Sequence, residues 1–127
     1  MAFPKREFYT TEEQWVADMS LGFCHPARPF IIGTLRCDGP KYVHELEKRM
    51  PLVQASVSHH LAKLRQVGIL DVEVQRLENL YHLNLKRFEE VADQYLQWFA
   101  DVIEGKAPGL IRPQAVIPEI GSLLEAG

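Results

Sequence analysis

The chain has 127 residues, 46% of them hydrophobic and 24% charged, a composition typical of one globular domain with a single core. Its net charge of −3 argues against indiscriminate binding to nucleic acid, which requires a basic surface that releases counterions. The sequence lacks an apolar run of about 18 residues and the basic-then-apolar order of a secretory signal, so we expect a cytoplasmic protein without membrane contact.

The charges are unevenly distributed along the chain. Residues 36–67 carry six Lys or Arg against three acids, a net charge of +3, whereas residues 85–127 carry four against seven. The sequence therefore predicts a local basic patch on an acidic protein.

The amino-terminal part is expected to be a flexible arm over residues 1–11, followed by a helix. Thr10 and Glu13 have the spacing of a capping box, in which hydroxyl and carboxylate satisfy the first free amides of a helix. Pro26 and Pro29 are tolerated only in the first turn of a second helix, which runs to about residue 36. A turn at residues 38–40 then leads to a third, short helix over about residues 42–50.

The fourth helix is expected over about residues 54–67. At about 100° per residue, its apolar side chains cluster on one arc, with His60 at the edge: Val57, Leu61, Leu64 and Val67. Ser58, His59 and Lys63 point elsewhere. Gly68 supplies a left-handed cap.

Two strand-like segments joined by a polar turn follow, with period-two alternation over residues 70–75 and a return strand over residues 80–83. A helix that presents small polar, His and Lys side chains, backed by a hairpin, fits the major groove of DNA. The sequence thus predicts a mainly α fold, a winged helix-turn-helix of about five helices plus a two-stranded wing, that binds double-stranded DNA.

The fifth helix is expected over residues 85–104, and its apolar arc of about 160° is wider than the ~100° stripe that one core usually buries. A homodimer would cover the surplus and present two recognition helices to successive major grooves. Residues 12–104 would then form one DNA-binding and dimerisation domain, and residues 105–127 a Pro-containing extended tail. The expected dimer interface is Trp15, Met19, Tyr95, Trp98, Phe99 and Val102.

Three motifs together carry a resemblance to a known family: His25-Pro26-Ala27-Arg28, then Val57-Ser58-His59-His60-Leu61 with Leu64 and Gly68, then a hairpin ending Tyr81-His82-Leu83-Asn84. Over about residues 12–104 the chain resembles the ArsR/SmtB family of small dimeric winged-helix repressors. The resemblance implies a bacterial or archaeal repressor that binds a palindromic operator as a homodimer and is released by an inducer, here unknown.

The resemblance also implies DNA contacts by Gln54, Ser56, Ser58 and His59, and it makes His60 an inward-facing histidine, which we expect to be half-buried and bonded to backbone. His59 suits a base edge or a phosphate, and serine hydroxyls suit phosphate oxygens, although each is also an ordinary surface residue. Lys63, Arg65 and the single wing cation Arg76 add phosphate attraction.

The chain departs from the family at the wing, where Asp71, Glu73 and Glu78 stand in place of common basic residues. Such a wing repels phosphates. Three outcomes are open: the hairpin is held away from the DNA backbone, the basic residues Lys5 and Arg6 take the place of the wing cations, or DNA binding is weak.

A second departure concerns metal. Tyr42 and His44 stand where arsenic sensors of the family have a Cys-x-Cys pair, and the fifth helix has no histidine for a zinc site. We therefore expect no metal and no other cofactor, and His44 is interpreted as a surface or cap residue.

Cys24 and Cys37 fit no zinc pattern. Thirteen residues of mostly helical chain separate them by about 20 Å, beyond the ~6 Å of a disulfide. Buried inert thiols are the favoured interpretation, and a thiol or redox sensor using either cysteine is the alternative.

Two other classes of function compete with the repressor. A winged-helix module that binds a protein through its acidic wing remains open. An enzyme using Cys24/His25 or His59/His60 is disfavoured, because adjacent helical residues point about 100° apart and do not converge on one atom.

Overall fold

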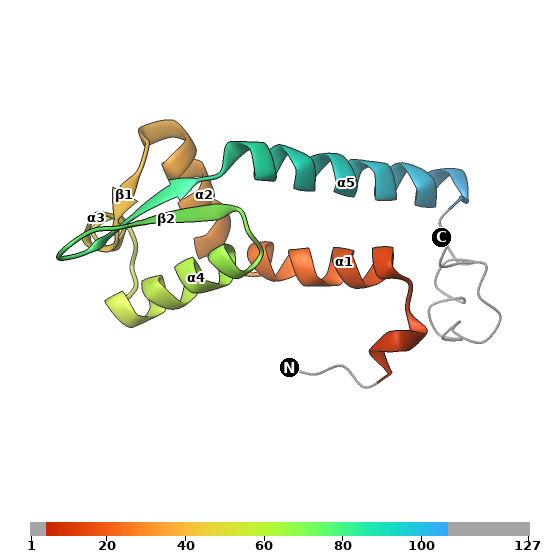
Figure 1. Cartoon of the computed structure of the whole chain (residues 1–127), viewed down its shortest axis with the longest axis horizontal. Coiled ribbons are helices and arrows are strands. Elements are labelled where there is room, and N and C mark those ends of the chain that lie inside the picture. Colours follow the sequence, from red (N-terminus) through yellow and green to blue (C-terminus); the bar gives the residue numbers. More distant parts are fainter. Residues whose placement is uncertain (1–4, 107–127) are drawn as a thin grey trace. The chain divides into compact units, whose positions relative to one another are not determined.

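The computed structural model describes residues 5–106, and residues 107–127 of the expected tail lie outside this range. The elements of Figure 1, in chain order, are η1 (Arg6–Phe8), α1 (Thr11–Ser20), η2 (Leu21–Phe23), α2 (Ala27–Asp38), β1 (Lys41–Tyr42), α3 (Val43–Glu47), α4 (Gln54–Gln66), β2 (Leu70–Val74), β3 (Asn79–Leu83) and α5 (Leu85–Glu104). Contacts divide the described chain into a larger unit, residues 18–93, and a smaller one, residues 5–17 with 94–106.

The core of the larger unit forms where α2, α3, α4 and the start of the hairpin pack together. Its fully buried side chains include Ile31, Leu46, Val57, Leu61, Leu64, Ile69 and Val91. The predicted apolar arc of α4 is confirmed, since all four of its members are buried. Burying one such aliphatic side chain contributes roughly 1.5–3 kcal/mol, so this arc fixes which face of α4 remains outside.

The local signals for helix boundaries are confirmed. The amide of Glu13 donates to Thr10 Oγ1 at 3.1 Å and the amide of Thr10 donates to Glu13 Oε1 at 3.0 Å, which is the predicted capping box of α1. Pro26 and Pro29 stand at the first turn of α2. Gly68 has a φ of +88°, the left-handed conformation that ends α4.

The sheet has one strand more than the predicted hairpin. The predicted two-stranded wing is present as β2 and β3, with Leu70 opposite Leu83 and Val74 opposite Asn79. The short strand β1 adds to β3 in antiparallel register, giving the order β1-β3-β2. β1 takes up Tyr42, and the helix α3 runs from Val43 to Glu47, so it is shorter than expected at both ends.

The predicted bounds of α5, residues 85–104, are those that the structure shows, and the side chain of Asn84 caps it by accepting the amide of Arg87 at 3.0 Å. None of the helices within residues 5–106 is long and apolar enough to span a membrane. The mainly α winged helix-turn-helix fold predicted from the sequence is confirmed.

Candidate nucleic-acid interface

The outer face of α4 carries polar side chains that make no hydrogen bond or ion pair within the described residues. Gln54, Ser58, His59 and Arg65 are exposed, whereas Ser56 and Lys63 are partly buried. Within residues 5–106 none of these six side chains makes a hydrogen bond or an ion pair. The ring of His59 contacts that of His60, with centroids 5.8 Å apart. Their donors and acceptors are therefore available to a ligand along the whole length of the helix.

Behind this face lies a buried polar pair that the sequence did not predict. His60 and Arg28 are each only 6% exposed, and Nε of Arg28 donates to Nδ1 of His60 at 3.0 Å. The expectation of a half-buried His60 bonded to backbone is therefore wrong: the ring is buried, and its partner is a guanidinium on α2. A bond between residues 32 positions apart leaves no local signal in the sequence.

The surroundings of His60 oppose its protonation. Burial comes first in lowering the pKa of His60, followed by the positive charges of His25, Arg28 and His59. The His25 ring lies 4.3 Å from that of His60, centroid to centroid, and its Nδ1 accepts the amide of Ala27 at 3.0 Å. The back of the candidate DNA-binding helix is thus held by a neutral imidazole.

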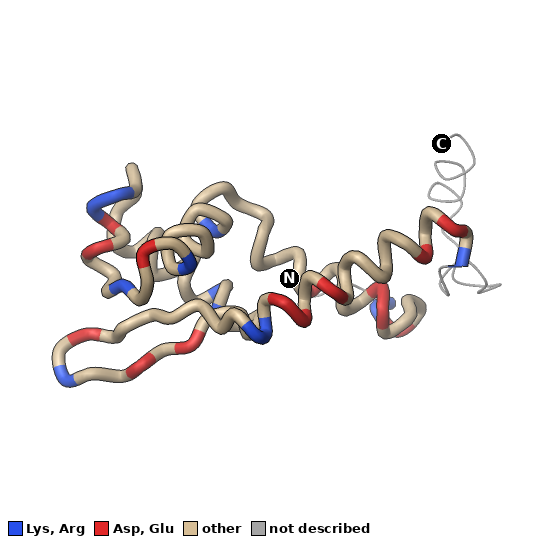
Figure 2. The backbone as a smooth tube through the Cα atoms, turned by 90° about the horizontal axis from the view of Figure 1, so that it is seen from above, with Lys and Arg blue, Asp and Glu red and all other residues tan. Residues whose placement is uncertain are grey.

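The hairpin carries the remaining predicted DNA contact, Arg76, which is exposed at its tip. Figure 2 shows acidic positions on both sides of that basic tip. The three acids, Asp71, Glu73 and Glu78, are all exposed. Two apolar side chains near the tip are also strongly exposed, Val74 at 78% and Leu77 at 92%.

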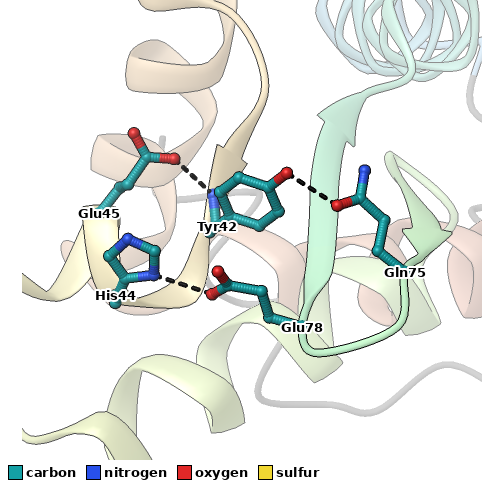
Figure 3. A network of polar contacts seen from close by, with 5 residues as sticks. All are labelled: Tyr42, His44, Glu45, Gln75 and Glu78. Atoms are coloured by element: carbon teal, nitrogen blue, oxygen red, sulfur yellow. Dashed lines mark hydrogen bonds and ion pairs between the residues drawn. The ribbon is translucent and has the colours of Figure 1, made fainter.

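A network of polar contacts ties the hairpin tip to the start of α3 (Figure 3). The hydroxyl of Tyr42 donates to Gln75 Oε1 at 2.7 Å, and Nδ1 of His44 lies 2.8 Å from Glu78 Oε2. The rings of Tyr42 and His44 stack, with centroids 5.8 Å apart and planes 6° apart. His44 is therefore a partner of the wing, a role that the sequence did not indicate because Glu78 is 34 residues away.

A second network of contacts runs along the hairpin itself. Nε2 of Gln75 donates to Glu73 Oε2 at 2.6 Å, and Nε2 of His82 lies 3.7 Å from Glu73 Oε1. Two of the three wing carboxylates thus face a histidine. The hairpin is acidic when these imidazoles are neutral.

The residues of this network do not form a metal site. In the part of the chain that the structure describes, no group of three or more His, Cys, Asp or Glu side chains is arranged to hold a metal ion. At the position of the family's Cys-x-Cys pair, Tyr42 instead donates its amide to Glu45 Oε1 at 3.0 Å. This hydrogen bond is the main cause of the lowered pKa of Glu45.

Both cysteines are free and exposed, so the favoured expectation of buried thiols is wrong. Sγ of Cys24 accepts a hydrogen bond from Nη1 of Arg28 at 3.2 Å and donates to the Leu21 carbonyl at 3.5 Å. Cys37 lies at the end of α2.

The smaller unit brings together several of the residues predicted at a dimer interface. The Trp15 and Tyr95 rings lie 5.1 Å apart and those of Trp98 and Phe99 5.4 Å apart, centroid to centroid, and the Tyr95 hydroxyl donates to the Val16 carbonyl at 3.2 Å. Apolar surface remains exposed beside them: Leu96 at 64%, Phe99 at 49% and Ile103 at 83%. Val102 is partly buried, as is Met19, which belongs to the larger unit.

Comparison with known proteins confirms the resemblance found in the sequence. Residues 26–72 match the model of a family described as bacterial regulatory protein, arsR family. The matched segment runs from the start of α2 into β2, so it contains α4 and the buried pair beneath it. No curated protein sequence matches the chain significantly.

Several solved structures share this architecture. A crystal structure titled as an ArsR family transcriptional regulator has a TM-score of 0.61 at 21% identity, covering 71% of this chain and 97% of that one. The transcriptional repressor BigR from Xylella fastidiosa has a TM-score of 0.52 at 27% identity, with coverages of 68% and 89%. Reduced HlyU from Vibrio cholerae has a TM-score of 0.50 at 27% identity, with coverages of 56% and 74%.

Proposed function

We propose that this chain, which carries an ArsR-family helix-turn-helix segment at residues 26–72, is a homodimeric transcriptional repressor that binds a palindromic operator in double-stranded DNA. The observation that supports the proposal best is the outer face of α4, whose polar side chains have no partners within residues 5–106, above a back that is fully buried. A rigid helix with that asymmetry suits the major groove.

The side chains of α4 divide into two roles. Gln54 and His59 are exposed and long enough to reach base edges, and a glutamine amide can pair with adenine through two hydrogen bonds. Ser56, Ser58, Lys63 and Arg65 suit phosphate oxygens, which position the helix without reading sequence. The two cations stand in the last turn of α4, where they also complement the helix dipole.

The second subunit would cover the exposed apolar surface of α5. The side chains of Leu96, Phe99 and Ile103 recur on this helix at spacings of three and four residues, the geometry of one continuous stripe. A twofold dimer buries the same stripe of both copies and doubles the number of recognition helices. An inducer that weakens this arrangement would release the operator.

Selection from random duplexes tests the proposal directly. The full chain should enrich an inverted repeat whose half-sites lie about one helical turn, or 10 base pairs, apart. The double variant Gln54→Ala/His59→Ala should lose that enrichment, whereas Gln66→Ala, at the exposed last position of α4, is the matched control and should keep it. Absence of any enriched sequence for the wild-type chain at low ionic strength would overturn the proposal.

A protein-binding winged-helix module is the alternative that one specific observation favours. The hairpin presents three exposed carboxylates around the single cation Arg76, a surface more suited to a basic partner than to phosphates. If the chain is such a module, its affinity for every duplex should remain low at moderate salt while a basic peptide binds the hairpin.

A further inference from the structure

Two of the three acidic side chains of the hairpin lie next to histidines, so the net charge here depends on whether those histidines carry a proton. Nδ1 of His44 lies 2.8 Å from Glu78 Oε2 (Figure 3), and Nε2 of His82 lies 3.7 Å from Glu73 Oε1. The side chains are 51% and 43% exposed in the first pair and 36% and 55% in the second. Protons from solvent therefore reach both pairs.

The net charge of this surface depends on whether two histidines are protonated. Residues 68–84 carry three acids and one Arg, a charge of −2 when the histidines are neutral. Protonation of His82 and of His44, which α3 supplies, brings the surface to zero. Histidine is the side chain whose charge ordinarily changes between pH 5 and 8.

We infer that the hairpin is a phosphate-contacting surface completed by proton uptake, in which His44 and His82 become protonated as the wing meets the DNA backbone. The inference rests on the proposed DNA-binding function and deepens it. A nearby phosphate favours an imidazolium over a neutral ring, and the imidazolium in turn screens the carboxylate beside it from the phosphate. DNA binding and protonation of these two side chains therefore reinforce each other.

The surroundings of His44 hold it in place for this role. The Tyr42 ring stacks on it, and the hydroxyl of Tyr42 fixes Gln75 of the hairpin tip at 2.7 Å, so the position of Glu78 beside His44 is part of a connected network. Glu45 of α3 interacts electrostatically with His44, and also with Lys41 of β1 and with Lys48, which directly follows α3.

The surroundings of His82 are more acidic than basic. Asp71 lies directly opposite His82 in the antiparallel register of β2 and β3, and Glu73 is its ion-pair partner. On the other side, Arg36 from α2 lines a small groove together with His82 and Pro40.

The test measures the dissociation constant of the full chain for a 30-base-pair duplex of mixed sequence at constant ionic strength between pH 8 and pH 6. Affinity should rise roughly tenfold on acidification, because two negative charges of the wing are offset. The variant His44→Gln/His82→Gln should lose most of this rise. At pH 8 the variant Glu73→Gln/Glu78→Gln should bind the duplex more tightly than the wild type does at the same pH.

A control variant that removes the same number of carboxylates elsewhere shows whether the pH dependence comes from the His–Glu pairs or from the net charge of the chain. Glu89→Gln/Glu90→Gln removes two exposed carboxylates from α5 that face no histidine, and it should leave the pH dependence intact. His59 is present in every variant, so its contribution is common to all of them when they are compared at the same pH. Far-UV circular dichroism of each variant checks that it is folded.

The outcomes distinguish the inference from the function on which it rests. If the wild type binds DNA but His44→Gln/His82→Gln shows the same pH dependence, the inference is overturned and the DNA-binding function stands. If no duplex is bound at any pH, both fail.

Discussion

Nε of Arg28, in the first turn of α2, donates a hydrogen bond of 3.0 Å to Nδ1 of His60, in the middle of α4. Because that nitrogen accepts, the neutral ring of His60 carries its own proton on Nε2. The same guanidinium donates to the carbonyl of Leu21 and to Sγ of Cys24. One buried side chain thus connects the segment before α2 to the back of the candidate recognition helix.

Removing the Arg28 guanidinium should lower the stability of the fold. Arg28→Met keeps an apolar stem of similar length but leaves the buried His60 nitrogen without its donor and the Leu21 carbonyl with only the Cys24 thiol. The free energy of unfolding should therefore fall by about 1–3 kcal/mol. Urea titration followed by circular dichroism measures the change. Arg36→Met, at an exposed position of the same helix, is the control and should change it by less than about 0.5 kcal/mol.

The stability of the fold should decrease in mild acid because of His60. Its pKa is lowered in the folded chain, first by burial and then by the charges of His25, Arg28 and His59, whereas an unfolded histidine titrates near 6.5. Between those two values the unfolded chain binds more protons, so stability rises with pH. The contribution is fully present above about pH 6.5 and is lost as the pH falls toward the folded pKa.

Urea titrations at several pH values between 5 and 8 check this dependence. His60→Gln, whose amide oxygen can still accept from Arg28, should flatten it. His82→Gln replaces a partly buried histidine of β3 and should leave the acid sensitivity in place. If the free energy of unfolding depends on pH equally in the wild type and in His60→Gln, another group is responsible for the acid sensitivity.

His59→Ala tests the outer face of α4. The ring is exposed and makes no hydrogen bond within residues 5–106, so its removal should cost little stability but about 1–3 kcal/mol of operator binding. Fluorescence anisotropy with a selected operator measures the affinity, and sedimentation shows whether the dimer is retained. Unchanged affinity would remove His59 from the interface.

Phe99→Glu tests the proposed dimer. The side chain is 49% exposed beside the rings of Tyr95 and Trp98, so a carboxylate there would be buried unpaired if a second subunit covers the stripe. Sedimentation equilibrium at micromolar concentration should show a dimer for the wild type and a monomer for the variant. Gln94→Glu adds the same charge to an exposed position about 140° around the axis of α5 and should remain dimeric. A dimeric Phe99→Glu chain would exclude this stripe from the interface.

Two glycines should respond to alanine in opposite directions. Gly68 has a φ of +88°, which an L side chain adopts only with strain, so Gly68→Ala should destabilise the fold by about 1–2 kcal/mol. Gly33 lies within α2, where an added Cβ meets no atom within 4 Å, so Gly33→Ala should stabilise it by about 0.5–1 kcal/mol. Thermal unfolding of the two variants gives both signs in one experiment.

The parts of the fold that depend on local chemistry could be predicted from the sequence. The Thr10–Glu13 capping box, the left-handed Gly68 and the apolar period over residues 85–104 each act within a few residues, and the structure contains all three. The two-residue strand β1 could not be predicted, because so short a segment has no period and exists only through pairing with β3.

The candidate site also combines features that follow from local sequence with features that depend on distant residues. Exposure of the polar face of α4 follows from its helical period, but the partners that surround the site come from distant positions. Arg28 meets His60 across 32 residues and His44 meets Glu78 across 34. Such pairs depend on how α2 and α3 pack in three dimensions, for which a single sequence carries no spacing signal.

The strand order β1-β3-β2 leaves the outer side of β2 without a neighbouring strand among the described residues. An open edge is a template for a strand of another molecule, and like charges along it discourage such addition. Asp71 and Glu73, exposed on this strand, therefore guard against polymerisation through the sheet. Replacing these acids with neutral residues to ease operator binding would remove that protection, so such a design should use Lys or Arg at these positions or shorten the edge.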